Sequence, residues 1–424
     1  MYKMKTQKGI TLIALIITIV VLLILAVVAI NSITNDGIIS KADQAANKYN
    51  ESVNNEANQL QNYLDFLNQY AGGSGNGGTG GGDDPVVYQT VSDAKTKSSV
   101  YQENKTLQDD YGNLVKLPAG FKIAADSATD VTGGVVIEDV SAKDATSKGN
   151  QFVWVPTGNI KTSATDTVGT TIELNRYDFA DGTNDKDANG DILTKGTPIA
   201  KGTAAIDPYY QELESSETYL NAKALSLTNF LNSAKPVTEG GNGGYYIGRY
   251  EAGDAIATAS NTARAKTTGA STPGTLVCKK DQVVYNYIYQ PDASTACRNM
   301  YTGNSNFTSD LVNSYAWDTA IVFIQTFGKN ADGTTISNYS ILNKSTKYGE
   351  AGENGDEYCK INDMSGNAME WTTETYSIGN FPCVNRGGYY GGGRASSSTS
   401  FRGVDSTTLS YSYYAFRPLL YVGL

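Results

Sequence analysis

The sequence predicts an α+β protein in three parts: a long N-terminal helix, a glycine-rich linker and a loop-rich C-terminal domain. Three observations support this prediction. Residues 10–30 carry no charge, residues 72–82 are mostly glycine, and the chain from residue 86 alternates short apolar runs with turn residues. Such changes in residue composition along a chain mark the boundaries between its parts.

The first part is long enough to cross a membrane. Lys3, Lys5 and Lys8 precede the uncharged run of residues 10–30. At about 1.5 Å per residue, a helix of this run spans about 30 Å, the thickness of a hydrocarbon core. The short basic leader is expected to stay in the cytoplasm, so that the rest of the chain faces outward. A secretory signal peptide is the alternative, although its apolar run would be shorter.

The start of this run resembles a type IV prepilin. The residues are Lys8-Gly9-Ile10-Thr11-Leu12-Ile13. In that family a peptidase cuts after the glycine, here Gly9, and methylates the new N-terminus, here Ile10. The resemblance implies contact with pilin subunits in a filament. Most pilins carry glutamate at the fifth mature position, where this chain has Ala14, so a plain membrane anchor is the alternative.

The helix is expected to continue through residues 38–70, because apolar residues recur there at helical spacing. The stripe consists of Ala46, Tyr49, Val53, Ala57, Leu60, Leu64 and Leu67. It predicts packing on neighbouring subunits or a coiled-coil stalk. We therefore divide the chain into a leader (1–9), a transmembrane helix with its stalk (10–70), a flexible linker (71–85) and a domain (86–424).

The domain is expected to be irregular, with few helices. Residues 215–231 and 314–327 have helical patterns, and the clearest strand candidates are residues 151–156, 245–250 and 419–422. Five stretches resemble, in order along the chain, the formylglycine-generating-enzyme and sulfatase-modifying-factor family, a branch of the C-type lectin fold. They are residues 152–156, 244–251, 315–320, the segment Asp363-Met364-Ser365-Gly366-Asn367-Ala368-Met369-Glu370-Trp371, and the pair Arg386-Gly387-Gly388 and Phe416-Arg417-Pro418.

Composition excludes several kinds of chemistry. The chain has no histidine, which removes Ser-His triads and imidazole-bound iron or zinc. With 33 Lys and Arg against 43 Asp and Glu, and no basic cluster beyond the first eight residues, it has no nucleic-acid footprint. Its four cysteines, Cys278, Cys297, Cys359 and Cys383, allow two disulfides in three connectivities or stay as buried thiols.

The resemblance to an enzyme family does not imply that this chain is an enzyme. The two cysteines that the family's oxygen-dependent enzymes use fall here on Gly392 and Ser397, and neither side chain can supply a thiolate. Copper and iron are therefore not expected as cofactors. A modifying enzyme of unknown mechanism stays as an alternative.

Calcium is the one metal that the remaining ligands suit. In the family, the segment around Asp363 wraps calcium, which here implies Asp363, Gly366, Ala368 and Glu370 as ligands. The alternative is a turn that holds itself by hydrogen bonds. A second candidate resembles the start of an EF-hand loop, with Asp185, Asp187, Asn189 and Asp191, but Gly196 stands where the bidentate glutamate belongs. A solvated turn is the alternative there.

Residues 386–418 form a tract that contains mostly Tyr, Ser, Thr and Gly between its borders. This composition is typical of antibody paratopes. The tract also resembles the variable region of proteins diversified by retroelements, which share this fold. Randomised adenines in Asn codons yield Tyr, Ser, Thr, Gly, Asp, Ala, Val, Leu or Phe, and residues 389–415 hold only these apart from Arg394 and Arg402. A solvated loop shaped by drift is the alternative.

We therefore expect a surface-displayed, non-enzymatic protein that binds a protein or glycan ligand outside the cell. It would be anchored in a bacterial cytoplasmic membrane or a pilus-like filament. A minor pilin or adhesin with a fixed partner is the alternative. The expected ligand contacts are Tyr389, Tyr390, Ser396, Ser398, Asp405, Thr407, Tyr411, Tyr413 and Tyr414.

Overall fold

A computed structural model describes the chain from residue 87 onward, with gaps. The described residues are 87–140, 149–179, 197–198, 210–212, 218–219, 222–223, 227–254, 276–344, 350–353, 355–376, 381–391 and 398–424. The chain divides into two compact units, Met1–Leu60 and Gln61–Leu424, and all described residues belong to the second.

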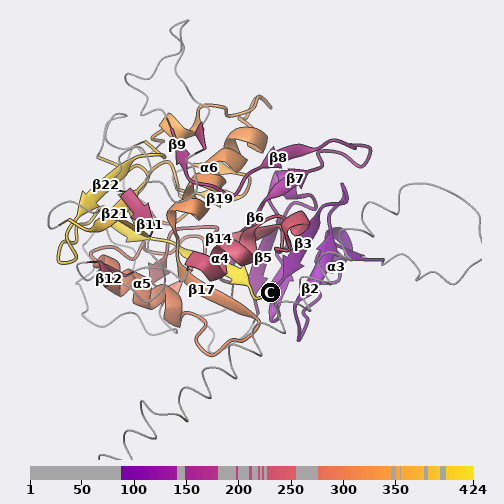
Figure 1. Ribbon diagram of the computed structural model, residues 1–424, viewed down its shortest axis with the longest axis horizontal. Helices are drawn as coiled ribbons and strands as arrows, with labels where there is room; N and C mark the ends of the chain where they lie inside the picture. The colour runs from indigo at the N-terminus through magenta and orange to yellow at the C-terminus, as the bar shows by residue number, and fades with distance from the viewer. Residues whose placement is uncertain are drawn as a thin grey trace, which may run out of the picture. The chain divides into compact units, whose positions relative to one another are not determined.

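A six-stranded antiparallel sheet organises this unit (Figure 1). Its strand order is β17-β24-β14-β6-β5-β4. The strands are β17 (Phe307–Leu311), β24 (Pro418–Val422), β14 (Gly244–Gly248), β6 (Gln151–Pro156), β5 (Val136–Asp139) and β4 (Phe121–Ile123). The last strand in sequence, β24, therefore lies between β14 and β17, which are far from it along the chain.

Both faces of this sheet are buried at its central strands, which explains why β6, β14 and β24 are almost continuously apolar. Along β6, Phe152 and Trp154 face one hydrophobic cluster, whereas Val153 and Val155 face the other. Because side chains alternate across a strand, a run with no polar residue can fill two cores. The sheet is thus the central layer of the unit.

Four α-helices occur in the part of the chain that the structure describes. They are α3 (Val91–Thr96), α4 (Leu227–Ala234), α5 (Gln290–Asn299) and α6 (Ser314–Phe327). Phe230 of α4 packs its ring at 5.4 Å from Tyr245 and 5.7 Å from Tyr421, on the same face of the sheet as α6. Helix α6 begins where the Asn313 side chain accepts a hydrogen bond from Ala316 N at 2.8 Å.

A second, five-stranded sheet carries the C-terminal tract. Its order is β11-β20-β21-β22, and β23 pairs in parallel with β20. The strands are β11 (Tyr210–Glu212), β20 (Met369–Tyr376), β21 (Cys383–Arg386), β22 (Arg402–Asp405) and β23 (Tyr414–Phe416). In Figure 1, β21 and β22 lie side by side, as their pairing requires. The tract therefore leaves the sheet at β21 and returns beside it at β22.

The remaining strands form smaller sheets. β1 (Gln89–Thr90), β2 (Lys105–Gln108) and β3 (Leu114–Leu117) make a three-stranded sheet. Two-stranded pairs are formed by β7 (Gly158–Ile160) with β8 (Thr170–Ile172), β9 (Tyr177–Asp178) with β10 (Thr197–Pro198), β12 (Thr218–Tyr219) with β13 (Ala222–Lys223), β15 (Gly253–Asp254) with β16 (Leu276–Val277), and β18 (Glu357–Tyr358) with β19 (Ile361–Asn362).

The predicted fold class is wrong. The chain that the structure describes is mainly β, with only the four helices above, whereas we expected an α+β protein with a long N-terminal helix. The predicted helix at 215–231 is also wrong, because β12 and β13 pair within it and α4 begins only at Leu227. The helix at 314–327 and the strand at 151–156 are confirmed.

The predicted membrane anchor falls on residues that the structure does not describe. No helix among the described residues has the length and apolar character needed to cross a membrane. The leader with Gly9 and Ile10, the helix and stalk at 10–70 and the linker at 71–85 lie outside the described residues.

Candidate functional site

Four tyrosines from the two ends of the tract come together, and we call them the tyrosine face: Tyr389, Tyr390, Tyr411 and Tyr413. The rings of Tyr411 and Tyr413 are stacked at 5.1 Å with 9° between their planes. Tyr389 lies 4.8 Å from Tyr413 and 6.0 Å from Tyr390. Tyr411 is 39% exposed and the other three are half-buried. The rings thus form one continuous aromatic group at the surface.

This group rests on the core through Tyr414. Its ring lies 4.9 Å from that of Tyr413 and 4.6 Å from buried Trp371. The Tyr414 hydroxyl donates to the carboxylate of Asp405 at 2.5 Å. Burial raises the pKa of Tyr413, and also that of Tyr414, where the hydrogen bond to Asp405 adds to the effect. These phenols therefore stay protonated, and act as hydrogen-bond donors, at neutral pH.

Backbone hydrogen bonds fix the positions of these tyrosines. Tyr390 N donates to Asn367 O at 3.1 Å, and Met369 N donates to Tyr413 O at 2.8 Å. The Asn343 side chain donates to Tyr389 O at 3.0 Å. Both ends of the tract are thereby attached to residues 367–369, around the start of β20 and outside the tract.

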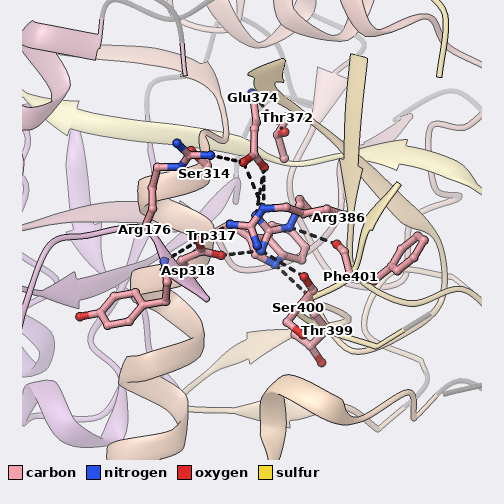
Figure 2. Close-up of polar contacts among 12 residues, drawn as sticks. Arg176, Ser314, Trp317, Asp318, Thr372, Glu374, Arg386, Thr399, Ser400 and Phe401 are labelled. Carbon is pink, nitrogen blue, oxygen red and sulfur yellow. Dashed lines mark hydrogen bonds and ion pairs between the residues drawn. The ribbon is translucent and has the colours of Figure 1, made fainter. Parts of the chain in front are cut away.

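Beneath the tract lies a buried group that we call the arginine frame, formed by Arg176, Arg386, Arg402, Asp318 and Glu374 (Figure 2). Arg386 donates to Asp318, and to Glu374 at 3.2 Å. Arg402 contacts the same two carboxylates, at 2.6 Å from Asp318 and 3.1 Å from Glu374. Arg176 lies 2.6 Å from Glu374. Arg386, at the start of the tract, and Arg402, on the neighbouring strand β22, thus share both carboxylates.

The charge balance of the frame keeps Glu374 ionised. Burial would raise the pKa of this carboxyl, but Arg402, Arg176 and Arg386 together lower it to about 2. Such charges are costly to bury and depend on one another, because removing one partner leaves another uncompensated. The frame is therefore a structural element and not a reactive one.

The middle of the tract is fixed by backbone contacts, as Figure 2 shows for Thr399 and Ser400. The Trp317 indole N–H donates to Thr399 O at 2.9 Å, and Arg386 Nε donates to Phe401 O at 3.1 Å. Ser400 N donates to Ser340 O at 2.9 Å. These residues therefore pack inward rather than toward a ligand.

The structure separates the expected contact residues into three groups. Tyr389, Tyr390, Tyr411 and Tyr413 form the tyrosine face, and Thr407 is half-buried. Three expected contacts are corrected, because their side chains lie inside the protein: Ser398, Asp405 and Tyr414. Ser396 lies outside the described residues. Sequence composition does not distinguish inward from outward serines, since the same residue type serves both positions.

The first expected calcium segment lies in a second buried group, the acid-rich cluster: Glu251, Asp356, Asp363, Glu370 and Arg417. The Arg417 guanidinium holds both oxygens of Glu370, at 2.9 and 2.6 Å. Glu251 accepts from Ala368 N at 3.0 Å, and Asp363 accepts from Gly352 N. Gly366 is buried in the turn between Asp363 and Ala368. Protein groups thus occupy several of the oxygens that calcium would need.

One arginine does not balance four carboxylates in this cluster. Burial raises the pKa of Glu251 well above its usual range, and the charges of Asp363 and Glu370 add to that effect. Burial likewise raises the pKa of Asp363 to about 7 and that of Asp356 to about 6. Part of the cluster is therefore protonated near neutral pH.

Within the described ranges, no group of three or more His, Cys, Asp or Glu side chains is arranged to hold a metal ion. The second calcium candidate, with Asp185, Asp187, Asn189 and Asp191, lies outside the described residues. All four cysteines are free thiols, and burial raises the pKa of each of them. The disulfides that we left open are therefore not formed in this structure.

The sequence did not predict a role in the arginine frame for three of its residues: Arg176, Asp318 and Glu374. Asp318 lies in one of the family-like stretches, directly after Trp317, and an acid inside an apolar helix is a signal for a buried ion pair. Arg176 and Glu374 carried no such signal.

Comparison with protein-family models, curated proteins and solved structures finds no match to this chain.

Proposed function

We propose that this protein is a non-enzymatic ligand-binding protein that acts outside the cell, and that the tyrosine face contacts its ligand. The observation that carries this proposal is the gathering of Tyr389, Tyr390, Tyr411 and Tyr413 from the two ends of one tract. Aromatic residues with a polar tip are enriched in binding hot spots.

The physical advantage of this face is its order before binding. Each tyrosine has only two rotatable side-chain bonds, and ring contacts with its neighbours already restrict them. Less conformational entropy is then lost when a ligand arrives. The arginine frame supports this order, because it holds the strands from which the tract departs.

Thiol chemistry is disfavoured by the buried cysteines. A nucleophilic cysteine needs a lowered pKa and access to substrate. Here burial raises the pKa of Cys278 to about 11 and that of Cys297 well above its usual range. With no histidine in the chain to act as a base, these features support binding rather than catalysis.

A binding assay with the full chain tests this proposal. The protein would be presented to a glycan array and to a phage-displayed random peptide library. Replacing both Tyr411 and Tyr413 by Ala should abolish binding of the selected ligands, whereas Tyr111→Ala, in the turn between β2 and β3, should not. Selected ligands that bind both variants as well as the wild type would contradict the proposal.

We further propose that the face is diversified by a retroelement. The division between buried framework residues and a face of Tyr, Ser and Thr supports this, because variation at the face would leave the core intact. The locus should then carry a reverse transcriptase gene and a near-repeat of the tract whose mismatches fall at adenines. Sequencing across a population decides: a tract that never varies would favour the second candidate, an adhesin with a fixed partner.

A further inference from the structure

A segment far from the tract in sequence lies against the tyrosine face. Tyr287 N donates to Tyr411 O at 3.2 Å. The neighbouring Asn286 side chain donates to Ser412 O at 2.7 Å. Tyr285, two residues before Tyr287, is buried, and the centroid of its ring lies 5.7 Å from that of the Phe416 ring. Residues 285–287 are therefore fixed against the part of the tract that carries Tyr411.

Tyr287 itself has an unfavourable backbone. Its φ is 54°, in the left-handed region, which costs a residue with a side chain on the order of 1 kcal/mol. Glycine or asparagine would adopt it more readily. The side chain is half-buried, and no hydrogen bond, ion pair or ring contact joins it to another residue that the structure describes. No polar or ring contact within the described part of the protein therefore accounts for a tyrosine at this position.

We propose that Tyr287 is a fixed contact residue that extends the tyrosine face, and that the ligand of this enlarged face is a protein. The inference rests on the proposed function, since it adds a residue to the same binding face. It assigns ligand contact to a residue outside the tract, so that one part of the face would stay constant when the tract changes.

The arrangement of the rings favours a protein over a glycan. A sugar ring stacks best on an open aromatic face. Tyr413 is instead surrounded by the rings of Tyr389, Tyr411 and Tyr414, at 4.8 to 5.1 Å. Ring edges and hydroxyls are left for contact, which suits the mixed apolar and hydrogen-bonding surface of a protein.

The described part of the face carries no exposed charge. Among the described residues between Tyr389 and Ala415, only Arg402 and Asp405 are charged, and both are buried against partners inside the protein. The face is therefore uncharged, although the whole chain carries a net charge of −10. Binding through it should depend little on salt, because no exposed ion pair is formed.

Variants at Tyr287 separate a contact role from a structural one. Peptides selected from the phage-displayed library would be measured against the wild type, Tyr287→Gly, Tyr287→Asn and Tyr287→Phe. The first two tolerate the left-handed backbone, so thermal stability should be unchanged or slightly higher. Affinity should nevertheless fall by about tenfold or more in both, and less in Tyr287→Phe, which keeps the ring.

The outcomes distinguish the two levels of the proposal. If Tyr411→Ala abolishes peptide binding but Tyr287→Gly does not weaken it, the role that we propose for Tyr287 is wrong and the proposed function stands. If glycans alone are bound, and their binding depends on Tyr411, the protein ligand is wrong. If no peptide or glycan binding depends on Tyr411, the proposed function fails, and this inference fails with it.

Discussion

The arginine frame and the acid-rich cluster are equally buried, yet they respond to burial in opposite ways. In the frame, three arginines lower the pKa of Glu374 to about 2. In the acid-rich cluster, the Arg417 guanidinium pairs with Glu370, and burial raises the pKa of Asp363 to about 7. Burial penalises charge in both places, so the local number of arginines decides the outcome. The contribution of the arginine frame to stability should not change with pH near neutrality, whereas that of the acid-rich cluster should.

Removing an arginine from the frame should have the largest effect. Arg386→Gln leaves Asp318 and Glu374 with less compensation in the interior, which should cost about 3 to 5 kcal/mol of unfolding free energy. Urea denaturation measures this loss. Lys97→Gln is the matched control, because its ion pair with Asp93 is exposed and should contribute less than about 0.5 kcal/mol. A loss below about 1 kcal/mol in Arg386→Gln would show that the frame is not the main support of the tract.

The next largest effect should come from replacing Glu374, and this effect should depend on pH. Its pKa is lower in the folded state than in the unfolded state, so its contribution is present above the unfolded pKa and is lost as pH falls toward about 2. Glu374→Gln should therefore be destabilised by about 3 kcal/mol at neutral pH. The difference from the wild type should shrink by about 2 kcal/mol on going to about pH 3. Denaturation at several pH values checks this, and a constant difference would contradict the charge balance given for the frame.

Replacing Asp363 should have a smaller effect on the unfolding free energy, and it should stabilise the protein rather than destabilise it. Its pKa is raised in the folded state, so the wild type loses stability as pH rises from the unfolded pKa of about 4 to about 7, and little more above that. Asp363→Asn removes the charge and keeps a residue that tolerates the φ of 62°. Its stability relative to the wild type should therefore rise between pH 5 and pH 8, by roughly 2 kcal/mol.

Calcium provides the control for that measurement. If these carboxylates bind the ion, adding calcium chloride at pH 8 should stabilise the wild type but not Asp363→Asn. Equal melting temperatures with and without calcium would leave the pH effect as a property of the protein alone.

The smallest effect is expected on the tyrosine face. Tyr390→Phe removes one hydroxyl, which lies 3.3 Å from the Ser412 hydroxyl at a half-buried position. The unfolding free energy should change by no more than about 0.5 kcal/mol. Thermal denaturation compares this variant with Arg386→Gln. A large loss would mean that the face, like the frame, is needed for folding.

The sequence predicted the parts of this structure that depend on local patterns. The apolar run at 151–156 and the helix at 314–327 have the observed bounds, because alternation and capping are properties of neighbouring residues. The number of short strands was underestimated, since pairs such as β12 with β13 depend on partners and not on propensity. This is why the expected balance of helix and strand was wrong.

The candidate site was predicted as a tract but not as a surface. Composition identified the tyrosines of the face. Distant residues hold the backbone beside Ser398, where Thr399 N donates to Leu342 O, and the strand of Asp405, which pairs with β21; no local pattern reveals these contacts. Tyr287 was missed for the same reason, because its place beside Tyr411 follows from the fold and not from its neighbours in sequence.

The position of β24 has a consequence for synthesis. This strand follows the tract along the chain and lies between β14 and β17, in the middle of the larger sheet. The ribosome must therefore translate the whole tract in the correct reading frame before the hydrophobic core can close. A frameshift or stop codon within the tract removes Leu419 and Leu420 from both cores. Such chains would expose apolar surface and be degraded, so that a folded molecule always carries an intact tract.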